Sequence, residues 1–102
     1  MEDRITQLTL LLQEQPGDAF LMYCMALELA QSQGVTIGIS HLTHLIAAQP
    51  DYLPSYYQLG QWFESIGKVN EAKVVYEQGI NLATQLGKVK ILGELKTALE
   101  GL

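Results

Sequence analysis

Two histidines and one cysteine are the residues of this sequence best suited to metal binding or nucleophilic chemistry. His41 and His44 lie three residues apart, a spacing that places both imidazoles on one face of a helix, where two metal ligands could meet. No third ligand accompanies them, because the only cysteine, Cys24, belongs to another segment and no acidic residue accompanies the pair. We therefore interpret them as surface or half-buried histidines and expect no metal site.

Motifs for other kinds of catalysis are missing from the sequence. It contains no glycine-rich phosphate loop, nucleophile elbow, HExxH motif or CxxC pair. Glu71 and Glu77 have lysines within reach and fit a solvated helix surface. Cys24 is interpreted as a buried thiol, because nothing near it in the sequence would lower its pKa. We therefore predict that the protein is not an enzyme and uses no cofactor.

The composition limits which kinds of partner and which cellular location are expected. The net charge of −5 argues against a nucleic-acid partner, since phosphate contacts require clustered lysine and arginine. No membrane span is expected, because no uninterrupted apolar stretch approaches the necessary length. Glu2 and Asp3 stand where a secretory signal would carry basic residues, so a cytoplasmic protein is the expectation. Only 17% of the residues are charged, which suggests more apolar surface than a monomer needs.

The elements that must position any functional residue are helices. Turn residues divide the chain into segments of about 14–17 residues, and each segment has apolar residues at the helical period rather than in alternation. The sequence predicts six helices and no strands. Pro54 fits the first turn of one helix. Four residues stand where N-caps are expected: Asp18, Thr36, Asp51 and Asn70.

The chain repeats itself after 34 residues. Five residues of the first segment, Ile5, Leu8, Thr9, Gln15 and Pro16, fall on the identical residues Ile39, Leu42, Thr43, Gln49 and Pro50. Small residues recur where two helices of a pair would cross: Ala26 and Gly60 on the first helix, Gly38 and Ala72 on the second. A period of this length that carries two helices indicates stacked helical repeats.

The repeat resembles that of the tetratricopeptide repeat (TPR) family, whose pattern is W-x2-L-G-x2-Y, then A-x3-F, then P. The second repeat reads Tyr56-x2-Leu59-Gly60-x2-Phe63, then Ala72-x3-Tyr76, with Thr84 where proline is expected. The first reads Met22-x2-Met25-Ala26-x2-Leu29, then Gly38-x3-Leu42, and has Pro50 in place. Without a proline at Thr84, the fifth helix should continue to Gln85 or Leu86 before Gly87 ends it.

The resemblance implies an all-α fold, a right-handed α-solenoid of antiparallel helix pairs in a single domain, 1–102. Its expected parts are an N-terminal half repeat (2–15), a first repeat (18–50), a second repeat (51–85) and a C-terminal capping helix (87–102). The last helix departs from the repeat pattern, since Lys90 and Thr97 fall where aromatic residues would be. Because one repeat cannot cover its own apolar face, neighbouring repeats must stack and the ends need caps.

The resemblance also implies a function, which is non-enzymatic binding of a partner peptide or helix in a concave groove lined by the first helix of each repeat. By position, the groove residues are Phe20, Tyr23, Leu27 and Gln31 in the first repeat and Tyr57, Gln61 and Glu64 in the second. The lysine and asparagine with which chaperone-binding members grip acidic C-termini are absent at the matching positions. A neutral, apolar or mildly basic ligand therefore fits better. Alternatively, Tyr23 and Tyr57 only pack against each other or against the capping helix.

A second function stays open, a structural module that assembles into a homodimer through its terminal helices. The candidate contacts are Ile5 and Leu8 on the half repeat and Leu92, Leu95 and Leu99 on the capping helix. The capping helix could fold onto the second repeat, dock into the groove of another copy, or pair with its own copy. Trp62, which points away from the face of Tyr56 and Phe63, would be an interface candidate if it is exposed.

Overall fold

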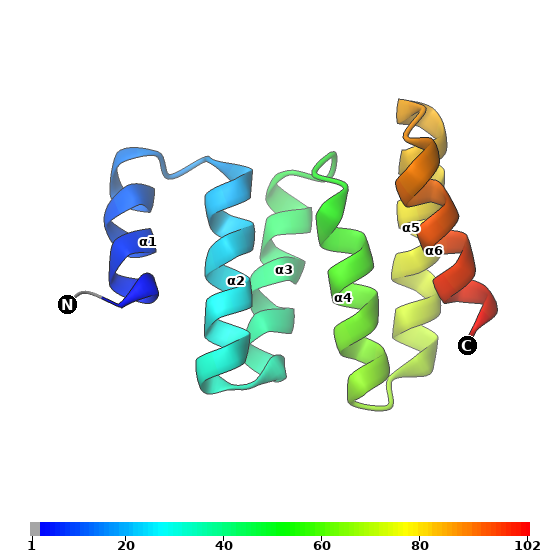
Figure 1. Ribbon diagram of the computed structural model, residues 1–102, viewed down its shortest axis with the longest axis horizontal. Coiled ribbons are helices and arrows are strands. Elements are labelled where there is room, and N and C mark those ends of the chain that lie inside the picture. Colours follow the sequence, from blue (N-terminus) through cyan, green and yellow to red (C-terminus); the bar gives the residue numbers. More distant parts are fainter. Residues whose placement is uncertain (1–2) are drawn as a thin grey trace. The chain divides into compact units, whose positions relative to one another are not determined.

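The computed structural model describes residues 3–102 and contains, in that range, six α-helices and no strand (Figure 1). The helices are α1 (Arg4–Glu14), α2 (Ala19–Gln33), α3 (Val35–Ala48), α4 (Pro54–Ser65), α5 (Val69–Leu86) and α6 (Val89–Glu100). The predicted number and type of elements are confirmed. Glu2, the first residue of the predicted half repeat, lies outside the described residues. The chain divides into two compact units, Met1–Pro50 with α1 to α3 and Asp51–Leu102 with α4 to α6.

Aspartate side chains cap the N-termini of the first two helices. The Asp18 carboxylate accepts a hydrogen bond from the Leu21 backbone N–H at 2.9 Å, and the Asp3 carboxylate accepts one from the Thr6 N–H at 2.7 Å. Each satisfies one of the N–H groups that the first turn of a helix leaves unpaired. The predicted cap at Asp18 is confirmed.

The other three expected N-caps, Thr36, Asp51 and Asn70, are wrong. α3 already begins at Val35, because Gly34 takes a φ of 107°, which glycine adopts without steric cost, and turns the chain directly into the helix. α4 begins later, at Pro54, whose ring fixes φ at a helical value. α5 begins at Val69, so Asn70 lies inside its first turn. None of these three helices has a side-chain capping hydrogen bond.

The first unit packs α2 against both α1 and α3. Its buried apolar residues are Leu8, Ala26, Leu42 and Leu45. An ion pair joins Arg4 of α1 to Glu28 of α2, with 2.9 Å between Nε and Oε1. The Gln49 side chain, just after α3, donates a hydrogen bond of 2.6 Å to the Gly17 carbonyl in the turn before α2.

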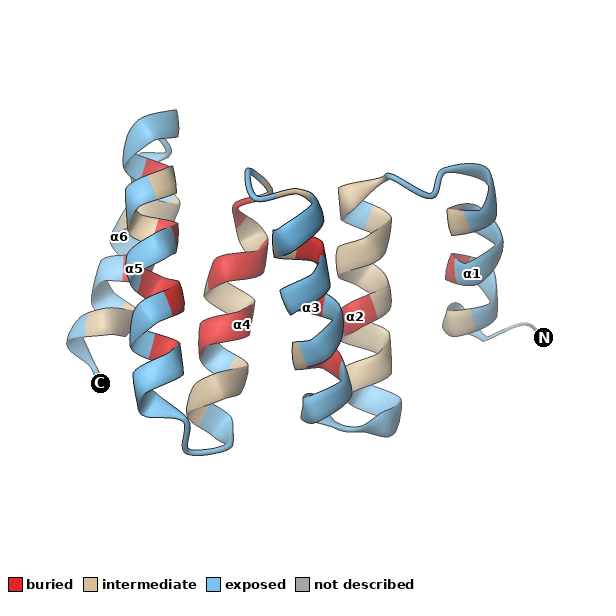
Figure 2. Cartoon of the chain, turned by 180° about the vertical axis from the view of Figure 1, so that it is seen from behind, coloured by how far each residue is buried: buried red, intermediate tan, exposed pale blue. Residues whose placement is uncertain are grey.

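The second unit places α5 in contact with both α4 and α6, and two glycines make these contacts close. A Cβ atom on Gly60 of α4 would lie 2.1 Å from the Tyr76 ring of α5. A Cβ atom on Gly79 of α5 would lie 2.8 Å from Cβ of Tyr56 and 3.1 Å from Cδ1 of Leu95 on α6. Figure 2 shows the resulting buried positions in red along α4 and α5. Of the three arrangements open to the last helix, the structure has the first, in which it folds onto the second repeat.

The fifth helix ends at Leu86, as the missing proline at Thr84 predicts. Gly87 follows it with a φ of 68°, in the left-handed region, and its N–H donates to the carbonyls of Ala83 and Thr84. No helix within the described range is long and apolar enough to cross a membrane.

Candidate functional site

A groove of about 620 Å³ lies in the second unit between α4 and α6. Its lining residues are Tyr57, Gln61 and Glu64 on α4 and Lys90, Gly93, Glu94, Thr97, Ala98 and Gly101 at or directly after α6. The α6 wall is made mostly of small residues at four-residue spacing, so it projects little into the space. A Cβ atom on Gly93 would meet no atom within 4 Å apart from its own helix backbone and its chain neighbours, so this wall is open here.

A hydrogen-bond network fixes the polar side chains of the α4 wall. The Tyr76 ring of α5 packs over Gly60, and its hydroxyl reaches two groove residues of α4, Gln61 and Glu64. The hydroxyl donates to the Glu64 carboxylate oxygen Oε2 and accepts from Gln61 Nε2 at 2.7 Å. Gln61 Nε2 also lies 3.4 Å from the same Glu64 oxygen. The absent side chain of Gly60 is therefore what lets a buried tyrosine hold two groove residues in place.

Tyr57 completes the α4 wall with a half-buried aromatic ring. Its ring lies 6.3 Å from the Tyr76 ring, centroid to centroid, with an angle of 46° between the two planes. This separation is within the range in which tilted aromatic pairs attract each other. The three α4 residues thus form a connected surface with one apolar and two polar side chains.

The Tyr76 phenol stays neutral over a wide pH range. Burial raises the pKa of Tyr76 above its usual value of 10, and the hydrogen bond to Glu64 and the negative charge of Glu64 raise it further. A phenol that stays protonated in the folded state lowers the stability of the fold only in alkaline solution, because there the unfolded chain can release the proton.

This raised pKa predicts an alkaline loss of stability. Below pH 10 the tyrosine is protonated in both the folded and the unfolded chain, so its contribution to stability is fully present; above pH 10 the unfolded chain ionises first. The free energy of unfolding should then fall by roughly 1.4 kcal/mol per pH unit from this residue. Urea unfolding between pH 8 and about 11.5 measures the slope, and Tyr76→Phe should make it shallower.

Tyr57→Phe is the matched control, because Tyr57 borders the same groove without the contact to Glu64. If Tyr57→Phe and Tyr76→Phe reduced the alkaline slope equally, the assignment to Tyr76 would be contradicted. The buried Tyr56, whose pKa is also raised by burial and by the charge of Asp51, should account for part of the slope that remains.

The groove candidates of the first repeat share one face of α2. Phe20 is 60% exposed, Gln31 is exposed, and Tyr23 and Leu27 are half-buried. On α4 the structure brings Tyr57, Gln61 and Glu64 together on a single groove, with α6 as its second wall. A continuous groove that joins the residues of both repeats stays a prediction.

The candidates for self-association lie in several environments. Leu8 and Leu95 are buried within their own units, so neither offers a free contact; Leu95 packs against Gly79. Ile5, Leu92 and Leu99 are half-buried, as is Trp62. The most exposed apolar side chains on the two terminal helices are instead Leu10 at 48%, Leu11 at 43% and Val89 at 79%.

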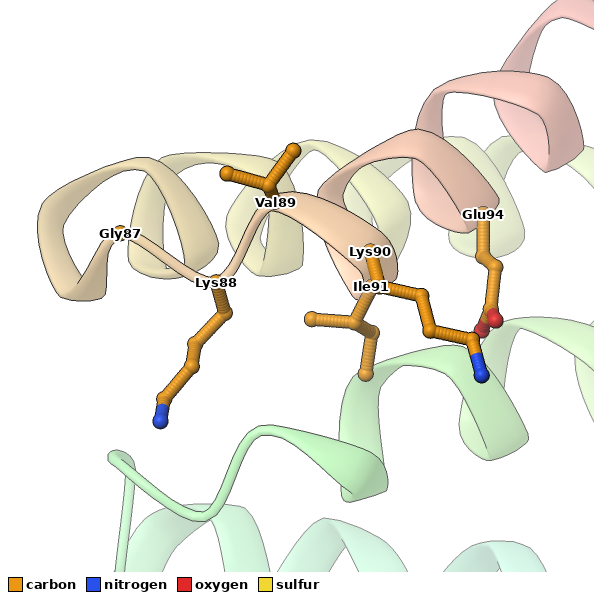
Figure 3. Close-up of a pocket in the computed structure, with 6 residues that line it drawn as sticks. All are labelled: Gly87, Lys88, Val89, Lys90, Ile91 and Glu94. Carbon is orange, nitrogen blue, oxygen red and sulfur yellow. The ribbon is translucent and has the colours of Figure 1, made fainter.

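The sequence did not predict that α6 forms a wall of the groove. This helix was expected to be a cap and a candidate surface for self-association. The four-residue spacing of Lys90, Glu94 and Ala98 and of Gly93 and Thr97 was the available signal. A second depression of about 480 Å³ lies at the beginning of the same helix and shares Lys90 and Glu94 with the groove (Figure 3).

His41 and His44 are exposed, and the described residues contain no cluster of three or more side chains suited to hold a metal ion.

Comparisons with known proteins place this fold in a family. No family model matches the chain, and no curated protein matches it. Two structures of a tetratricopeptide repeat domain protein from Salinibacter ruber are similar to it. The crystal structure is 33% identical, covers 83% of this chain and 98% of its own, and has a TM-score of 0.76. The solution structure is 31% identical, covers 84% and 87%, and has a TM-score of 0.80.

A solution structure of a protein from Bordetella parapertussis, 20% identical, shares the fold over 98% of this chain and 87% of its own, with a TM-score of 0.82. The prediction of an all-α, TPR-like solenoid is therefore confirmed. At this identity and coverage to the Salinibacter ruber domain, the chain belongs to the tetratricopeptide repeat family.

Proposed function

We propose that this protein is a non-enzymatic protein-interaction module that binds a peptide or helix of a partner protein in the groove between α4 and α6. The observation that carries the proposal is the groove between α4 and α6, whose α4 wall consists of the three residues that the TPR resemblance implies for this repeat.

The chemistry of the groove suits recognition. Tyr57 offers a large contact area at a small cost in side-chain entropy, which is why tyrosine is common on recognition surfaces. Gln61 and Glu64 are fixed by Tyr76 before any partner arrives, so binding would not have to order them. The charged side chains that line the groove are Glu64, Lys90 and Glu94, which can form ion pairs with a partner.

Site-specific photo-crosslinking tests this proposal in the intact protein. A photoreactive amino acid at Thr97, which lines the groove, should crosslink a partner from a cell extract, whereas one at the exposed Lys73 of α5 should not. Tyr57→Ala should remove the crosslink, because it deletes the main apolar contact of the groove. Identical products from both positions, or products that persist in Tyr57→Ala, would contradict a partner site in the groove.

A homodimeric scaffold is the second candidate. The observation in its favour is the exposure of Leu10 and Leu11 on α1 and of Val89 on α6, since large apolar side chains on a surface mark contact sites. Leu10→Lys would then shift the mass measured by light scattering toward the monomer. A strictly monomeric wild-type protein at high concentration contradicts this candidate.

A further inference from the structure

We propose that the groove between α4 and α6 accepts a partner segment through a basic side chain, arginine or lysine, that pairs with Glu64 and lies against the Tyr57 ring. The inference rests on the proposed function and adds the chemistry of the partner. Three features support it: the way Glu64 is held, the shortage of cations around it, and the aromatic face beside it.

Glu64 is a preorganised acceptor. One carboxylate oxygen, Oε2, takes both the Tyr76 hydroxyl and the Gln61 amide. The other oxygen, Oε1, forms no hydrogen bond or ion pair within residues 3–102. Both donors to Oε2 are neutral, so they orient the carboxylate without cancelling its charge. A carboxylate held in this way keeps one oxygen for a cationic donor and loses little side-chain entropy when it binds one.

The protein supplies Glu64 with no cation of its own in the described structure. Lys68, four residues along the chain, pairs with Glu71 at 3.9 Å. Lys90 is the one cation among the groove-lining residues, and it has Glu94 one turn further along α6. Figure 3 shows the Lys90 and Glu94 side chains extending toward each other, while Val89 points away from them. With two carboxylates and one ammonium, the groove carries an excess negative charge that a partner cation would balance.

Tyr57 adds a face on which a basic side chain can lie. It is seven residues before Glu64, two helical turns along α4, and both side chains line the same groove. An arginine or lysine that reaches Glu64 can place its aliphatic stem or its charged group over this ring and gain a cation–π contact. The small residues of the α6 wall leave room for the segment that carries it.

Selection of binding peptides tests this inference. A random linear peptide library displayed on phage is selected on the full-length protein, and the enriched peptides are synthesised for affinity measurements by calorimetry. We expect the enriched peptides to share an arginine or lysine, and Glu64→Gln to weaken their binding by about tenfold. Glutamine keeps the shape of the side chain and an oxygen for the Tyr76 hydroxyl, so the network around it should persist.

Glu77→Gln is the matched control, because it removes one negative charge from an exposed position of α5 outside the groove. It should change the affinity by less than about twofold. Replacing the basic residue of the peptide by norleucine should weaken binding to the wild type as much as Glu64→Gln does. In the Glu64→Gln background the same replacement should have almost no further effect, which identifies the two groups as partners.

The outcomes separate this inference from the function on which it rests. Peptides that need Tyr57 but bind equally well to Glu64→Gln, or that keep their affinity with norleucine, overturn the basic-residue inference and leave the groove as a binding site. Peptides that are insensitive to Tyr57→Ala, or a selection that enriches none, overturn both.

Discussion

Replacing Gly60 by alanine is expected to lower the free energy of unfolding by about 3 kcal/mol, the upper end of what overpacking a core costs. The added Cβ would lie 2.1 Å from Cε1 and 2.5 Å from Cζ of Tyr76. That ring is fully buried and joined to Glu64 and Gln61 through its hydroxyl, so it cannot move aside without breaking these hydrogen bonds. At most helix positions the same substitution stabilises, by roughly 1 kcal/mol.

Gly93→Ala is the control for this prediction. Gly93 lies within α6, and a Cβ atom there would meet nothing within 4 Å apart from its own helix backbone and its chain neighbours. Urea unfolding followed by circular dichroism should show Gly93→Ala to be as stable as the wild type or more stable, and Gly60→Ala to be much less stable. A Gly60→Ala protein of wild-type stability would mean that the Tyr76 ring does not lie against this backbone.

The first repeat shows why alanine is acceptable at the corresponding position. Ala26 occupies it, and the residue that corresponds to Tyr76 there is Leu42. Both residues are fully buried, and their counterparts Gly60 and Tyr76 in the second repeat are buried too. Each repeat thus has a small residue at the first position and a large one at the second, but only Tyr76 carries a hydroxyl that reaches the groove.

Much of the fold could be predicted because its causes are local or periodic. Apolar spacing predicts each helix, the 34-residue period predicts their pairing, and the loss of proline at Thr84 predicts the longer α5. The residues at which the helices begin were harder to predict. The sequence predicted a capping side chain at Thr36 and Asn70, but α3 and α5 begin without a side-chain cap.

The groove was predictable on one side only. Tyr57, Gln61 and Glu64 are groove residues by resemblance to the TPR family, in which the first helix of each repeat lines the groove. Glu64 is held by the hydroxyl of Tyr76, which lies on another helix. This contact depends on the space that Gly60 leaves for the Tyr76 ring, and no short sequence pattern reveals such a dependence. The α6 wall could not be predicted from the repeat, because α6 does not follow the repeat pattern. Leu95 packs against α5, but the residue 34 positions earlier is the groove residue Gln61.

Leu95→Ala is expected to destabilise the second unit by about 3 kcal/mol and to open the groove. Leu95 is fully buried and contacts the backbone of α5 at Gly79, where its methyl groups fill the space that a side chain would otherwise take. Removing them leaves a cavity between α5 and α6, a change that costs about 2–5 kcal/mol at buried leucines. Since α6 forms one wall of the groove, binding of a partner or of a selected peptide should weaken in the same variant.

Val89→Ala serves as the control for Leu95→Ala, because Val89 begins the same helix but is 79% exposed. Its effect on the free energy of unfolding should stay below about 0.5 kcal/mol. Both variants should be unfolded in urea at two protein concentrations well apart. If α6 packs on its own chain, the loss in Leu95→Ala is the same at both concentrations; if it docks instead on another copy, wild-type stability rises with concentration and the mutation removes that dependence. A loss below about 1 kcal/mol would contradict the packing of Leu95 against Gly79.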